Sequence, residues 1–150
     1  MQNAENINNN EKRGAVTLAV FALATIVLWQ LPGGGYILYP FTILGTWFHE
    51  MGHGIAALLL GGNFHYLELF PNGSGLAAHS GPLFLGNIGK ALVAGAGPLG
   101  PTITGALFIA ASTRQKMTSL ILFLLGIMLI VSLVFWVRPV FGFGFAVILL

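Results

Sequence analysis

Two histidines and a glutamate form the segment best suited to chemistry, His49-Glu50-Met51-Gly52-His53. On an α-helix, His49 and His53 lie about 40° apart around the axis and about 6 Å apart along it, so both imidazoles leave one face. A tetrahedral Zn²⁺ site requires such a pair. Glu50 lies about 100° around from His49, where its carboxylate can accept a proton from a water molecule whose pKa zinc lowers toward about 7. The segment predicts metal-dependent hydrolysis.

The composition indicates that the element carrying these residues lies in a membrane. Of the 150 residues, 56% are hydrophobic and only 7% are charged, whereas a soluble domain has about 25% charged residues. Glu50 is the only acidic residue within a predicted membrane segment, and an ionisable group there is costly unless it is paired or functional. This context favours a functional site over an accidental polar helix end. The basic residues are scattered, which argues against nucleic-acid binding, and cysteine is absent.

The long apolar stretches predict an all-α, multi-pass transmembrane helix bundle of about four helices and the start of a fifth. A small β-hairpin is expected after the His-Glu helix, and Gly61-Gly62 should end that helix. The expected elements are spans at about 14–31, 41–60, 88–111, 117–137 and, in part, 141–150, a hairpin loop at 63–80, and a disordered polar tail at 1–13 before a membrane domain at 14–150. Residues 36–40 are interpreted as an interfacial or re-entrant piece. The partial last span is the pattern expected of a piece of a longer protein.

A zinc site needs a third protein ligand, and the sequence offers His65, Glu68 and His79 as candidates. Strand alternation would place His65 on one face with Leu67 and Leu69, and Glu68 on the other. A surface role is favoured over metal binding for each candidate.

Glycine and proline residues near these elements have two interpretations each. Gly52 and Gly54 either keep the metal face uncrowded or allow close helix packing. The small-residue segment 94–101, with Pro98 and Pro101, is either an opened backbone beside the site or a packing seam. The hairpin at 63–80 either connects two helices or, as favoured here, offers a strand edge to an extended substrate.

Several of these motifs together resemble the site-2-protease-type membrane metallopeptidases, in particular their bacterial peptidase-like branch. The resemblance covers about residues 44–146 and rests on four motifs. These are Phe48 to Gly54, Gly61-Gly62 followed by Pro71 to Leu76, Gly95 to Pro101, and Arg138 to Gly142. The first motif is the most specific of the four.

The resemblance implies a zinc ion held by His49 and His53, with Glu50 as general base. It also implies a multi-pass protein, expected in a bacterial cytoplasmic membrane, that cleaves membrane proteins or peptides in or near the bilayer. Better-studied relatives take a third ligand, an aspartate, from a later transmembrane segment, whereas this sequence contains no aspartate. Thr102 and Thr104 are the nearest polar residues to the place where those relatives have an asparagine.

Two other functions remain open. The chain could be a catalytically inactive relative that acts as a membrane scaffold or regulator. A metal transporter is less favoured, because the predicted spans 88–111 and 117–137 offer mainly serine and threonine as polar groups.

Overall fold

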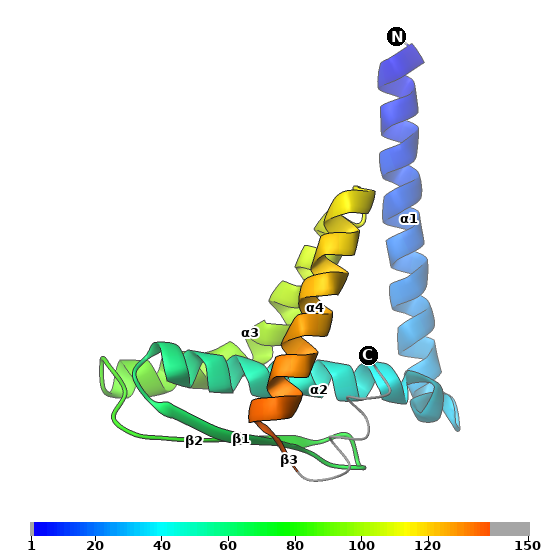
Figure 1. Cartoon of the computed structure of the whole chain (residues 1–150). Helices are drawn as coiled ribbons and strands as arrows, with labels where there is room; N and C mark the ends of the chain where they lie inside the picture. The colour runs from blue at the N-terminus through cyan, green and yellow to red at the C-terminus, as the bar shows by residue number, and fades with distance from the viewer. Residues whose placement is uncertain (1, 139–150) are drawn as a thin grey trace. The chain divides into compact units, whose positions relative to one another are not determined.

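The computed structural model describes residues 2–138, with side chains described from Lys12 onward. The elements follow one another as α1 (Gln2–Gln30), α2 (Gly34–Leu59), β1 (Asn63–Leu69), β2 (Gly75–Ser80), α3 (Asn87–Ala111), α4 (Gln115–Phe135) and β3 (Val137–Arg138) (Figure 1). Contacts within the chain define two compact units, Met1–Phe41 and Thr42–Leu150. The predicted fifth span at 141–150 lies outside the described residues.

In the first unit, α1 contains the predicted first span. From Lys12 to Gln30 it is long and apolar enough to cross a membrane. The helix begins at Gln2 and so includes the polar residues for which the sequence predicts a disordered tail. Helix propagation is easier than nucleation, so a helix formed by the apolar stretch can extend into a polar one.

Helix α2 begins earlier than the sequence predicts. Residues 36–40 belong to this helix and are not a separate re-entrant piece. Pro40 lies inside it and lacks the N–H group that would donate to the carbonyl of Tyr36, but the helix continues through that position. At the other end, Gly61 has φ +84°, and Gly62 donates from its backbone nitrogen to the Ala57 carbonyl at 2.8 Å. The predicted end at Gly61-Gly62 is therefore confirmed.

The predicted hairpin is also confirmed, and it belongs to a three-stranded sheet. Strands β1 and β2 are antiparallel, and β3 pairs in parallel with β1 to give the order β2-β1-β3. In the connecting turn, Gly73 has φ +87°, and the side-chain oxygen of Asn72 accepts hydrogen bonds from the backbone nitrogen and hydroxyl of Ser74. Strand β3 was not predicted, because Val137 reads as the end of an apolar span.

One face of this sheet packs against α2. The buried residues of β1 on that face are Phe64, Leu67 and Leu69, and their partners on β2 are His79, Ala77 and Gly75. A Cβ atom at Gly54 of α2 would overlap the Phe64 ring. The sheet therefore brings β2 to the helix that carries His49, Glu50 and His53.

Two tryptophans connect α4 to the rest of this unit. Trp47 of α2 is buried and donates from Nε1 to the Ser132 hydroxyl of α4 at 3.1 Å. Trp136 follows α4, stacks on Phe64 with ring centroids 5.1 Å apart, and donates to the Phe64 carbonyl at 3.2 Å. These contacts hold α4 against both α2 and β1.

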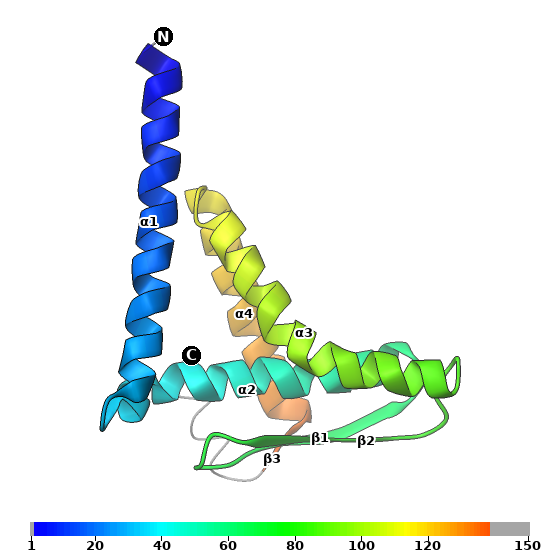
Figure 2. The same cartoon turned by 180° about the vertical axis from the view of Figure 1, so that it is seen from behind.

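Helices α3 and α4 match the predicted spans closely. Helix α3 contains Pro98 and Pro101 and bends partway along its length (Figure 2). In the described part of the chain, three helices are long and apolar enough to cross a membrane: α1 from Lys12, α3 and α4. Helix α2 is not one of them, so the predicted span at 41–60 stays a prediction.

Candidate metal centre

The structure brings His49 and His53 together as neighbours on α2. Their Nε2 atoms are 3.1 Å apart, and the ring centroids are 4.8 Å apart. Two imidazole nitrogens bound to one tetrahedral zinc ion, each at about 2.0–2.1 Å, would be separated by about 3.3 Å. The observed separation fits that requirement to within a few tenths of an ångström.

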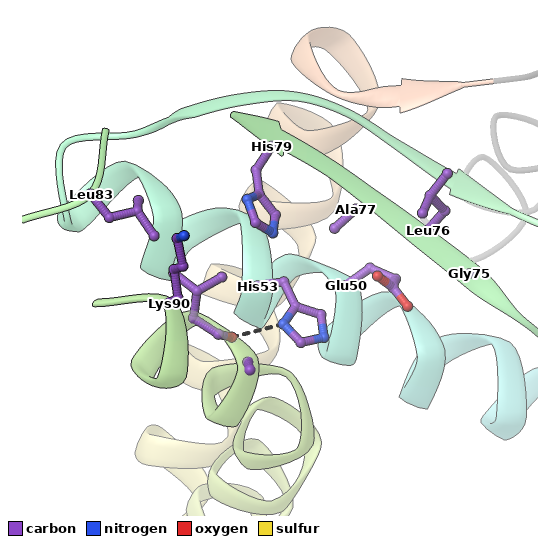
Figure 3. Close-up of a pocket in the computed structure, with 10 residues that line it drawn as sticks. Glu50, His53, Gly75, Leu76, Ala77, His79, Leu83 and Lys90 are labelled. Atoms are coloured by element: carbon purple, nitrogen blue, oxygen red, sulfur yellow. Dashed lines mark hydrogen bonds between the residues drawn. The ribbon is translucent and has the colours of Figure 1, made fainter. Parts of the chain in front are cut away.

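A hydrogen bond from α2 to α3 sets the tautomer of His53. Its Nδ1 lies 2.8 Å from the backbone carbonyl oxygen of Val93, which can only accept, so Nδ1 carries the proton (Figure 3). With the proton on Nδ1, the lone pair of His53 Nε2 faces His49. A carbonyl partner of this kind orients metal-binding histidines in many proteins.

Glycines allow α2 and α3 to cross at very short range. A Cβ atom at Gly97 of α3 would overlap the His53 ring, and one at Gly52 would overlap the carbonyl oxygen of Ala96. A Cβ atom at Gly100 would overlap the carbonyl oxygen of Phe48. The small-residue segment 94–101 is thus a packing seam, and Gly97 within it provides the space that the His53 ring occupies.

Glu50 is buried, with 9% of its surface exposed, and it lies against the hairpin. A Cβ atom at Gly75 would lie 2.7 Å from the Glu50 Cγ atom. No hydrogen bond joins the Glu50 carboxylate to another described residue, and no buried side-chain oxygen or nitrogen in the described part lacks a partner. The carboxylate oxygens of Glu50 are therefore not fully buried and are exposed in the two pockets that Glu50 lines.

Two pockets meet at Glu50 and Gly75. The larger, of about 490 Å³, is completed by Gly45, Thr46, His49, Ser74 and Pro101. The other, of about 350 Å³, is completed by His53, Leu76, Ala77, His79, Leu83, Lys90, Val93 and Ala94 (Figure 3). The candidate ligands and base thus line space that a substrate could enter.

No third ligand is found in the part of the chain that the structure describes: no three His, Cys, Asp or Glu side chains lie close enough together to hold a metal. His65 is exposed and hydrogen-bonds to the Ser80 hydroxyl at 2.6 Å. The prediction that it shares a face with Leu67 and Leu69 is wrong, because a register shift between Phe64 and Tyr66 interrupts the alternation.

The other two candidates also fall outside a ligand group. In the strand register, Glu68 lies opposite Leu76 of β2 and Arg138 of β3, and its side chain is on the face opposite Leu67. His79 lines the same pocket as His53 and Glu50 but does not form a three-residue ligand group with them. The donors present fit two positions of a zinc site and its neighbouring base.

Sequence reasoning missed three features that shape the site: the Val93 carbonyl, the contact between Gly75 and Glu50, and Lys90. The first two depend on how α3 and β2 pack against α2, which no local pattern encodes. Lys90 had a signal, since it is the only lysine or arginine between positions 14 and 113.

Comparison with known proteins supports the resemblance noted from the motifs. The family model described as Peptidase M50B-like matches residues 17–150. No curated protein and no solved structure matches the chain. Within residues 2–138, three helices are long and apolar enough to span a bilayer. The chain is an integral membrane protein of the site-2-protease type, and it belongs to the Peptidase M50B-like family.

Proposed function

We propose that this protein is an intramembrane zinc endopeptidase that hydrolyses peptide bonds of membrane-associated substrates. The observation that carries the proposal is the pairing of His49 and His53 through their Nε2 atoms, 3.1 Å apart, beside the accessible carboxylate of Glu50. A bound zinc ion would polarise the scissile carbonyl and make a water molecule acidic enough to attack it at neutral pH.

Each residue of the site has a separate task in this reaction. His49 and His53 would hold the ion through Nε2, and the Val93 carbonyl keeps the proton of His53 on Nδ1. A carboxylate oxygen of Glu50 accepts the proton of the attacking water and later donates it to the leaving amide nitrogen. The buried stem of Glu50, packed against Gly75, keeps the carboxylate in position.

Strand β2 is well placed to present the substrate. It is an edge strand of the described sheet, and its residues Gly75, Leu76 and Ala77 line the pocket that contains Glu50 and His53. A peptide added to this edge would be extended, as proteolysis requires, and held by main-chain hydrogen bonds that do not depend on its sequence. This arrangement supports a substrate-binding role for the hairpin.

One observation favours a second candidate function, that of an inactive scaffold or regulator. The described residues supply two histidine ligands and no third, whereas catalytic zinc sites have three protein ligands. Such a protein would bind membrane segments without cleaving them.

The test is cleavage of a membrane-tethered substrate by the full chain in vesicles, comparing the wild type with Glu50→Gln. The amide removes the base but nearly preserves shape, so cleavage should fall by roughly 10²- to 10⁴-fold while zinc binding persists. Full activity of Glu50→Gln would refute the role of Glu50. A wild type that binds zinc and substrate but never cleaves would support the scaffold.

A further inference from the structure

We propose that Lys90 forms an anion-binding subsite that selects substrates with an acidic side chain close to the scissile bond. This inference rests on the proposed protease function and adds a substrate preference to it. The subsite is the pocket of about 350 Å³ that Lys90 shares with Glu50, His53 and His79.

Lys90 and the catalytic residues reach this pocket from different elements. Lys90 lies in the first turns of α3, His79 lies on β2, and Glu50 and His53 lie on α2. In the close-up, Lys90 lies on one side of His53, near Leu83, and Glu50 lies on the other side, near Gly75 (Figure 3). The ring of His79 points from β2 toward the space between them. A ligand near the catalytic carboxylate can therefore come within reach of the Lys90 ammonium group.

Within the described structure, no residue forms an ion pair with Lys90. The first turn of α3 contains no acidic residue either. The start of a helix already carries partial positive charge, so a lysine there reinforces the positive potential where an acid would offset it. Among the described residues, Glu50 is the only acidic side chain lining the pocket, and its carboxylate is assigned to the reaction. The complementary anion must come from the ligand.

The geometry favours a peptide carboxylate as that ligand. A peptide lying along β2 would pass Gly75 and Ala77, and every second side chain would point toward α2 and this pocket. An aspartate or glutamate one or two residues from the scissile bond would then meet Lys90. A lipid phosphate would have to enter the space that the substrate needs.

Cleavage of matched substrates tests this preference. Two tethered substrates would differ only in glutamate or glutamine at each position flanking the cleavage site. Wild type should cleave the glutamate form with about fivefold higher kcat/KM, as expected for an exposed ion pair. Lys90→Gln should abolish the preference and Lys90→Arg should retain it. Lys116→Gln, which removes an exposed lysine outside the pocket, should leave it unchanged.

A second readout does not require catalysis. In Glu50→Gln protein, a carbodiimide would activate the carboxylate of a bound glutamate peptide, and the Lys90 amine would displace the urea to form an amide bond. Mass spectrometry should locate the crosslink at Lys90, and Lys90→Arg should eliminate it. A crosslink without any cleavage by wild type would contradict the protease function but support the subsite.

Two results would overturn the inference. The first is cleavage of both substrates at equal rates by wild type, with no crosslink at Lys90. The second is a Lys90→Gln defect that affects both substrates equally and appears only in vesicles of anionic phosphatidylglycerol, since Lys90 would then bind a lipid headgroup.

Discussion

The crossing of α2 with α3 and the exposed length of α4 are both largely apolar, yet their glycines differ in what surrounds them. At the crossing, a Cβ atom on Gly52, Gly97 or Gly100 would overlap backbone or a histidine ring. On α4, a Cβ atom at Gly126 would meet nothing within 4 Å. Glycine is therefore required where it borders the candidate metal centre and is replaceable at position 126 of α4.

The largest effect in this comparison is expected from Gly97→Ala. The added methyl group would displace the His53 ring from its place beside the Val93 carbonyl. Loss of such an orienting contact lowers metal affinity by about 10- to 100-fold, and the upper end is expected here because the ring itself must move. Zinc titration of the purified protein measures the change. The control is Gly126→Ala, for which an affinity as low as that of Gly97→Ala would contradict the account.

A smaller effect is expected from Gly75→Ala, which changes the base and leaves the ligands in place. The new Cβ atom would lie 2.7 Å from both Glu50 Cγ and Thr46 Cγ2, so the carboxylate must shift. Cleavage should fall by at least about tenfold, while zinc affinity stays at the wild-type value. The control is Gly105→Ala, at an open position of α3, which should change neither zinc affinity nor cleavage. Equal losses of zinc affinity and cleavage in Gly75→Ala would show that metal binding and the role of Glu50 are not separate.

The smallest effect is on stability. It tests whether the buried hydrogen bond between α2 and α4 stabilises the protein. Trp47→Phe removes the hydrogen bond to Ser132 and should lower the free energy of unfolding by about 1 kcal/mol. Trp29 of α1 is 56% exposed, so Trp29→Phe should change the free energy of unfolding by less than about 0.5 kcal/mol. Unfolding of each variant in mixed detergent micelles measures both values. Equal losses would mean that the contact from α2 to α4 adds nothing to stability.

The sequence predicts elements that depend on local patterns. The helix stop at Gly61-Gly62 and the hairpin turn at 71–75 follow from backbone conformations that glycine, proline and asparagine favour. The bounds of α3 and α4 follow from apolar stretches with polar ends.

What the sequence does not predict depends on contacts between distant segments. A register shift between Phe64 and Tyr66 places His65 on a different face from Leu67 and Leu69, and the alternating sequence pattern contains no sign of that shift. Strand β3 exists because Leu67 of β1 pairs with Val137, seventy positions later in the chain. The same limit applies at the candidate metal centre, where the spacing of His49 and His53 predicts the candidate ligands but not the Val93 carbonyl that orients His53.

The most direct test of the central claim is the zinc content of the full chain, purified without a polyhistidine tag, with His49→Ala and His53→Ala as matched variants. If His49 and His53 bind the ion, wild type and Glu50→Gln should contain equimolar zinc, and both histidine variants should lose it. A wild-type protein that neither contains zinc nor takes it up on titration, or histidine variants that keep it, would contradict the assignment of these residues as metal ligands.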